Sequence, residues 1–488
     1  METGMIIWQP QAAFGLLLVA TLLVWLGGEK ARGSSSLILS ALAGAFVILA
    51  TLFPLVGTGQ IFRQTFSILP PFGLSFHADL FSVSLALLFL FSGFVLALYT
   101  SAYPLKHDER RFKTAFLFIM ACASGVVLAG DLLSLFLFFE AMSLVFFLLI
   151  IHNRTREAIA ATYKFIYLTI GGSMCYFMAL ATVFVQADSF AWVQGGFMPA
   201  TSLSALAFGG FVIAFGMKAG MVPLHFWLAA AYGQAPPPAA VLSSVIMMKT
   251  GAYGMIRIFH HVFGPEMLSL HGWDKLILSF ALFTIFYGSF CAFAERDLLR
   301  RLAYSSMAQL SYILFGLALL NQAALVGAIF HILAHGMMKG TMLLCAGAIV
   351  SKTGKRKIAD LEGIGRQMPL TMACFSLAAL TAVGLPPMNI FIVKWYLSLG
   401  ALSAGQPLLI LFLLASSLLN AAYYLPIVFR AYFGAESSDL HDRLVWDRLP
   451  WPMTVAMLLF ASACLVFSLG SVNLPLEWTK RIAAGFFY

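Results

Sequence analysis

The sequence predicts an all-α integral membrane protein of about fourteen transmembrane helices. Of its 488 residues, 61% are hydrophobic and only 10% are charged, whereas soluble globular proteins carry about 25% charged residues. So few charged side chains cannot cover the surface that a chain of this length would expose to water. The composition therefore excludes a soluble enzyme, a nucleic-acid-binding protein and a disordered scaffold.

Fourteen apolar stretches are long enough to form membrane-spanning helices, because a bilayer core of about 30 Å needs about 20 helical residues. The stretches are continuous and lack the period-two alternation of barrel strands, which favours helices. The predicted spans are 11–28, 36–57, 79–102, 113–130, 131–151, 161–186, 203–231, 237–261, 273–294, 300–320, 323–350, 370–402, 406–430 and 451–471.

Two of these spans, the seventh and the twelfth, are predicted to be broken inside the membrane. The seventh contains Pro223 and the twelfth contains Pro386 and Pro387. Proline removes a backbone donor and clashes with the preceding turn. The broken spans are five spans apart, so the second enters the membrane from the opposite side. This pattern predicts two inverted five-helix repeats, spans 4–8 and spans 9–13, with an ion site near the midplane.

The repeats divide the chain into four segments. Residues 1–112 hold the N-terminal helices 1–3, 113–261 the first repeat, 273–430 the second repeat, and 431–488 a cytoplasmic connection with the last helix.

The basic residues favour one orientation of these spans. Nineteen of the 29 lysines and arginines lie in loops that follow odd-numbered spans, five lie in the other loops, and five lie inside spans. The positive-inside rule assigns the richer loops to the cytoplasm. Both termini are therefore predicted on the outer face.

Several titratable residues fall inside the predicted spans, although a charge at the bilayer centre costs at least about 2.5–3.5 kcal/mol. Glu140 is the acidic residue predicted at mid-depth, and Lys218 and Lys394 flank the two helix breaks. A further group, His331, His335 and Lys339, recurs every fourth residue and so shares one helix face. The candidate relay residues are Glu140, Lys218, Lys249, His331, His335, Lys339 and Lys394, with Lys164 and His225 as weaker candidates.

Such a row, with water between its members, can pass protons, because burial disfavours the charged form of each side chain. Structural alternatives remain open at this point. Lys164 or Lys249 can extend to a membrane surface, His331 can join two helices by a hydrogen bond, and Glu140 can be a static partner of Lys218. The six cysteines form no metal or redox motif, and no phosphate-binding loop or nucleophile motif is visible. No metal, cofactor or redox chemistry of its own is expected.

Five ordered motifs across residues 70–430 resemble a known family. The stretch FGMKAGMVPLHFWLAAAYGQAPPPAAVLSSVIMMKTGAYGMIRIF (215–259) closely resembles the hallmark of the proton-translocating antiporter-like family. This family includes large Mrp-type cation/proton antiporter subunits and related subunits of complex I and membrane-bound hydrogenases. The other motifs are DLLSLFLFFEAMS (131–143), ERDLLRRLAYSSMAQLSYILFG (295–316), FHILAHGMMKGTMLLCAGAIV (330–350) and DLEGIGRQMPLTMACFSLAALTAVGLPPMNIFIVKWYLSLGAL (360–402).

The resemblance implies a fourteen-helix fold with broken helices seven and twelve, and it implies roles for particular residues. Glu140 and Lys218 correspond to the family's ion pair, Lys249 to the next relay position, and Lys394 to the second-repeat position. The family's connecting helix matches the stretch that holds His331, His335 and Lys339. The PLHFW segment holds His225 and Trp227, and there a packing role and a relay role are both possible.

The expected function is proton translocation by a subunit of a multisubunit complex in a prokaryotic cell membrane, most similar to the D subunit of Mrp-type cation/proton antiporters. The alternatives are a proton-pumping subunit of a redox complex, such as NADH–quinone oxidoreductase or a hydrogenase, and a purely structural membrane subunit. Membership of an oxidoreductase complex therefore stays open. The expected partners are other membrane subunits, protons and lipid, with no nucleic acid. Because Glu140 alone lies at mid-depth, sodium is expected to travel through a partner.

Overall fold

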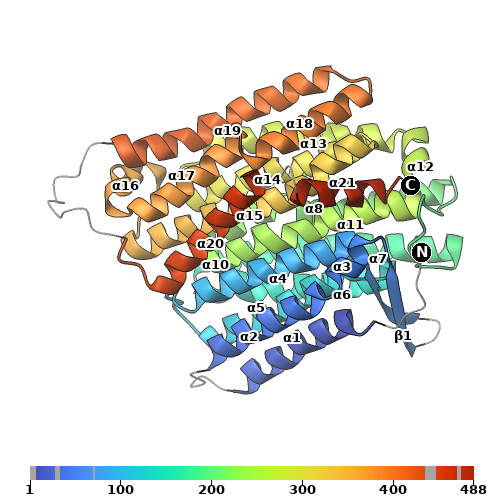
Figure 1. Cartoon of the computed structure of the whole chain (residues 1–488), viewed down its shortest axis with the longest axis horizontal. Coiled ribbons are helices and arrows are strands. Elements are labelled where there is room, and N and C mark those ends of the chain that lie inside the picture. The colour runs from blue at the N-terminus through green and yellow to red at the C-terminus, as the bar shows by residue number, and fades with distance from the viewer. Residues whose placement is uncertain (1–6, 28–32, 70–71, 435–446, 470–473, 488) are drawn as a thin grey trace.

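The computed structural model describes residues 7–27, 33–69, 72–434, 447–469 and 474–487. Most of these residues form helices that lie alongside one another in a single bundle (Figure 1). Within the described ranges, ten helices are long and apolar enough to cross a membrane. The chain is therefore a largely helical membrane protein, as its composition predicts.

The helices follow the predicted spans closely. In the first half they are α1 (Gln9–Leu26), α2 (Ser34–Ala50), α3 (Phe53–Gly57), α4 (Leu80–Thr100), α5 (Glu109–Val127), α6 (Leu132–Ile150), η1 (Ile151–Asn153), α7 (Arg156–Ala187), α8 (Ser202–Ala219), α9 (Phe226–Gln234), α10 (Pro237–Leu242), η2 (Ser243–Met247), α11 (Met248–Ile258) and η3 (Phe259–Phe263). In the second half they are α12 (Pro265–Leu270), α13 (Trp273–Ala294), α14 (Leu298–Ala318), α15 (Gln322–Thr353), η4 (Ile358–Leu361), α16 (Ile364–Gln367), α17 (Pro369–Val383), α18 (Asn389–Ser403), α19 (Leu408–Phe433), α20 (Trp451–Leu469) and α21 (Pro475–Ala484).

A β-hairpin, which the expected all-α fold omitted, lies between α3 and α4. Its strands are β1 (Phe62–Leu69) and β2 (Phe72–Ala78), paired antiparallel. Hydrogen bonds from the backbone of β2 fix the hairpin to the bundle. Ser75 N donates to Ser134 Oγ at 2.7 Å, and His77 N donates to Leu128 O at 2.7 Å. We call this end of the bundle, at the right of Figure 1, the hairpin end.

The short helix α21 was also not predicted. Ten residues of helix span about 15 Å, too little to cross a bilayer. It packs along α15 and ends at the hairpin end (Figure 1).

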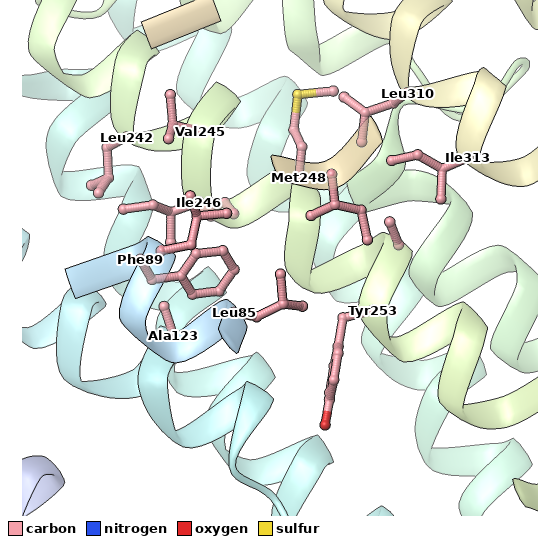
Figure 2. Packing of buried hydrophobic residues seen from close by; sticks show 14 of the residues in the cluster. Leu85, Phe89, Ala123, Leu242, Val245, Ile246, Met248, Tyr253, Leu310 and Ile313 are labelled. Atoms are coloured by element: carbon pink, nitrogen blue, oxygen red, sulfur yellow. The ribbon is translucent and has the colours of Figure 1, made fainter. Parts of the chain in front are cut away.

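The centre of the bundle is formed by two stretches that are buried on every side, α10 to η3 and α15. Figure 2 shows how Leu85 and Phe89 of α4 approach Ile246, and how Leu310 of α14 lies near Met248. The outer helices, by contrast, expose large apolar side chains to the surroundings. Polar groups on the two central stretches are therefore separated from lipid by a layer of apolar side chains.

The structure interrupts the seventh and twelfth predicted spans near the prolines. Helix α8 ends at Gly220 with φ 74°, and α17 ends at Gly384 with φ 84°, a left-handed conformation that glycine adopts without strain. Each break leaves backbone carbonyls without helical donors. Trp227 Nε1 donates to Met217 O at 3.0 Å in the first break, and Lys394 Nζ donates to Val383 O at 2.9 Å in the second.

Replacing Gly384 with alanine is expected to destabilise the chain by about 1 kcal/mol or more. A Cβ here would lie 3.2 Å from Lys394 Nζ, in addition to the unfavourable φ. The thermal midpoint of the detergent-solubilised protein measures this. Gly209→Ala is the control, because a Cβ at that position has nothing within 4 Å. Equal midpoints for the two variants would contradict the prediction.

Candidate functional site

Six titratable residues predicted from the sequence lie inside the bundle. Lys218 and Lys394 retain 1% and 8% exposure, whereas Lys249, His331, His335 and Lys339 are fully buried. Buried lysines are rare, because an unpaired ammonium is costly outside water. Each of them must therefore find polar partners within the protein.

Glu140 and Lys218 are linked through hydroxyl groups of α7. The two side chains make no direct ion pair, although both lie in the described part of the chain. Ser173 Oγ lies within hydrogen-bond distance of the Glu140 carboxylate and of Thr169 O, the latter at 2.8 Å, and its single proton is donated to one of them at a time. Lys218 Nζ makes a long contact, 3.5 Å, to Thr169 Oγ1. The expected acid–lysine pair is thus not in direct contact, and Ser173 and Lys218 meet different atoms of Thr169, its carbonyl and its hydroxyl.

Lys218 is otherwise surrounded by aromatic rings. Its Nζ lies 4.7 Å from the ring centre of Phe165 and 5.8 Å from that of Phe139. The negative face of an aromatic ring attracts a cation. These rings therefore stabilise the ammonium group in a site that is almost closed to the surroundings.

Lys249 and His335 are in direct hydrogen-bond contact. Lys249 Nζ lies 2.7 Å from His335 Nδ1, and it also donates to Ser244 O. An ammonium group only donates, so His335 Nδ1 accepts when Lys249 is charged, whereas neutral Lys249 accepts from Nδ1–H. Moving one proton along this bond therefore interconverts the two states.

From His335 the contacts continue to Lys394. The rings of His335 and His331 are 5.4 Å apart, and that of His331 is 5.6 Å from Tyr312. Lys394 Nζ lies 5.6 Å from the Tyr312 ring centre. We call Lys249, His335, His331, Tyr312 and Lys394 the lysine–histidine row.

Hydroxyl groups of α19 line the far end of this row. Tyr312 OH donates to Ser416 Oγ at 2.8 Å, and Lys394 Nζ donates to Ser417 Oγ at 2.6 Å. The sequence reasoning missed Tyr312 and these serines, because hydroxyl residues in apolar helices usually bond to their own backbone. Their adjacency in SSLLN at 416–420 was the available signal.

Lys339 points away from the row. Its Nζ donates to Leu302 O at 3.1 Å, to Tyr424 OH at 2.9 Å and to Ser305 Oγ. It therefore forms a side branch toward α14 and α19.

Three candidates are not joined to the row by any contact in the described ranges. Lys164 is exposed on the outer face of α7. His225 is buried at the start of α9, where its ring packs 5.1 Å from Tyr287. Trp227 packs 5.2 Å from Phe165. Lys218 and Lys249 are not linked to each other either. Among the described residues they share no hydrogen-bond partner.

No group of three or more His, Cys, Asp or Glu among the described residues is arranged to hold a metal ion.

A helical bundle that encloses a row of lysines and histidines defines a multi-span membrane protein with a buried chain of titratable groups. Comparison with known proteins agrees with this class. The chain belongs to the NADH:quinone oxidoreductase/Mrp antiporter transmembrane family, whose model matches residues 129–420. The family resemblance seen in the sequence is confirmed.

The similar proteins include subunits of two kinds of membrane complex. The N subunit of the NADH-quinone oxidoreductase of Desulforudis audaxviator is 34% identical over 375 residues, 74% of each chain. The D subunit of the Na(+)/H(+) antiporter of Alkalihalophilus pseudofirmus is 28% identical over 372 residues, 75% of each chain.

Solved structures share the fold at lower identity. A chain of the Mrp complex from Dietzia sp. superposes with a TM-score of 0.88 at 22% identity, covering 98% of this chain and 97% of that one. A chain of an archaeal membrane-bound sulfane sulfur reductase gives a TM-score of 0.87 at 22% identity, with the same coverage.

Proposed function

We propose that this chain moves protons across a membrane as an antiporter-like subunit of a multisubunit complex. The observation that carries the proposal is the order of side chains from Lys249 through His335, His331 and Tyr312 to Lys394, in which one hydrogen bond is followed by ring approaches of 5.4 to 5.6 Å. The series crosses from α11 to α18 and so joins the two halves of the chain. A purely structural role does not require titratable groups in sequence along that path.

Proton movement begins with the short Lys249–His335 bond, along which one proton shifts. Hydrated gaps carry the proton past His331 and Tyr312 to Lys394, where Ser417 and Val383 O solvate the ammonium group. Glu140 and Lys218, which contact Ser173 and Thr169, are assigned to the other end of the path, and a hydrated gap separates Lys218 from Lys249. The role of each residue is part of this proposal.

In this proposal the chain crosses the membrane fourteen times. Residues 113–261 and 273–430 form the inverted repeats, and segments 1–112 and 431–488 flank them. Matching glycine-ended breaks in α8 and α17 support it. We infer that the hairpin end is the outer face of a prokaryotic cell membrane, because the opposite end carries loop arginines such as Arg154, Arg296 and Arg356.

The activity of the complex is inferred to be Mrp-type cation/proton exchange with other membrane subunits as partners. Sodium is assigned to a partner subunit, because Glu140 is a single carboxylate and cation sites need several oxygen ligands. A second candidate is a proton-pumping subunit of a redox complex. The 34% identity to an NADH-quinone oxidoreductase subunit favours it.

Replacing Glu140 with glutamine or Lys218 with methionine is expected to lower proton transport by the intact complex at least about tenfold. The complex is purified whole, reconstituted into liposomes and assayed by a pH-sensitive dye, with its subunits identified by mass spectrometry. Lys275→Met is the control, because Lys275 is exposed at the start of α13. Normal transport by both variants would support a structural subunit instead. Co-purifying iron–sulfur subunits would support the redox pump.

A further inference from the structure

A second cluster of titratable groups lies at the hairpin end, separate from the lysine–histidine row. Arg257 of α11 is 1% exposed, and its Nη2 contacts both carboxylate oxygens of Asp79, at 2.8 and 2.7 Å. His77 of β2 places its Nε2 3.2 Å from Asp79 Oδ2. Neither the expected relay nor the helix breaks use this cluster.

The cluster faces a cavity of about 580 Å³ between α3, β2, η3 and α21. Its charged and titratable lining consists of His77, Asp79, Arg257, His261 and Arg481. The volume holds many water molecules, each of which takes about 30 Å³. Water can therefore reach the cluster from this end of the bundle.

Histidines on η3 complete the surroundings. The ring of His261 packs 5.3 Å from Phe486, and its Nδ1 has no hydrogen-bond partner among the described residues. His260 Nδ1 donates to Ile256 O at 3.0 Å, and its ring lies 4.8 Å from Phe486. His261 is thus the histidine of this pair that lines the cavity, and its side chain is half-buried whereas His260 is buried.

Asp79 and Arg257 both carry a fixed charge in this cluster. Burial acts to raise the pKa of Asp79, but Arg257 and His77 outweigh it and hold that pKa well below its usual range. Asp79 therefore stays ionised, and Arg257 does not release its proton. The histidine side chains that line the cavity beside this fixed pair are His77 and His261, whose ring nitrogens can both accept and donate hydrogen bonds.

Helix α11 carries residues of both the cluster and the lysine–histidine row. Lys249, Tyr253 and Arg257 follow one another at four-residue spacing, which keeps them on one flank of the helix. Arg257 Nε donates to Tyr253 OH at 2.9 Å. Tyr253 lies one turn, about 6 Å along the axis, from Lys249.

We infer that this cavity is a proton-exchange vestibule for the hairpin end, in which His77 and His261 pass protons between bulk water and the lysine–histidine row along α11. Its ligand is the hydrated proton, and Asp79 and Arg257 act as positioning residues. The inference rests on the proposed function, since it supplies one entry or exit for the same path.

The test uses the intact complex in liposomes. The double variant His77→Gln/His261→Gln is expected to lower proton transport at least about tenfold and to flatten its dependence on the pH of the hairpin side. Asp79→Asn is expected to lower transport as well, while asparagine still caps α4 at Ser82 N. The matched control is Asp131→Asn, since Asp131 caps α6 at the same end through Ser134 N at 2.7 Å and does not line the cavity.

A second measurement does not depend on the histidine variants folding. Gln60 lines the cavity, so Gln60→Cys treated with a bulky, membrane-impermeant thiol reagent from the hairpin side is expected to lose transport. The unmodified chain, with its six native cysteines, is the control for labelling elsewhere.

Wild-type transport by both the histidine double variant and the labelled cysteine variant overturns the vestibule. If Lys218→Met is inactive in that case, the proposed function still stands. Normal transport by Lys218→Met instead contradicts the proposed function itself. A loss of sodium dependence at unchanged proton flux also overturns the inference, in favour of a cation site.

Discussion

Replacing Lys249 with methionine is expected to lower proton transport by the intact complex at least about 100-fold while leaving the complex assembled. Lys249 is the residue through which the row begins, because its Nζ contacts His335 Nδ1 at 2.7 Å. Methionine has nearly the same length and is apolar, so it fits the fully buried site. It cannot carry a proton. Proton flux into liposomes measures the effect, and size-exclusion chromatography measures assembly.

Arginine at the same position separates a relay from a structural charge. Lys249→Arg keeps the positive charge, but a guanidinium group does not release its proton in a protein. A relay loses transport in both variants, whereas a structural cation is restored by arginine. Wild-type transport by Lys249→Arg would therefore contradict the proposed role of Lys249.

Replacing Arg301 with methionine is expected to destabilise the chain by about 3 kcal/mol or more. The guanidinium group donates to Glu295 O at 3.0 and 2.6 Å and to Phe293 O at 3.2 Å, and so satisfies the carbonyls at the end of α13. It also donates to Tyr423 O of α19 at 3.1 Å. Thermal unfolding of the purified complex measures the loss.

The neighbouring Arg300 is the matched control for Arg301. Its side chain is 47% exposed and pairs with Glu295 at 3.3 Å. Exposed ion pairs contribute at most about 1 kcal/mol. Arg300→Met is therefore expected to change the thermal midpoint little. Equal losses for the two variants would show that charge, and not the bonds to backbone carbonyls, stabilises this end.

The membrane-spanning helices could be predicted from the sequence because burial in lipid imposes a length and a composition on each of them. The breaks at Gly220 and Gly384 could be predicted because proline cannot continue a helix. The hairpin could not, since two short strands between spans leave no comparable pattern. Strand β1 begins FRQTF, in which three polar residues stand together, so the period-two alternation typical of a strand is absent.

The sequence names Lys249, His335, His331 and Lys394 of the lysine–histidine row as candidates, but it does not predict their contacts. A charge inside an apolar stretch identifies Lys249 and His335 separately, whereas their 2.7 Å contact joins helices 86 residues apart and depends on packing. The same is true of Asp79 and Arg257, which lie 178 residues apart. Asp79 caps α4 through Ser82 N, a role that accounts for an acidic residue at a helix start without any second partner.

Helix α7 supplies both hydroxyl groups between Glu140 and Lys218, while its opposite side exposes Tyr167 and Met174 by 71% and 66%. Hydrogen bonds weaken steeply with length and angle. Anything that leans against this outer side, whether a lipid chain or an adjacent protein, therefore bears on the acid–lysine link without touching either charged group. Helix α7 therefore contacts both charged groups on one side and carries any contact made at its outer surface to the hydrogen bonds between them.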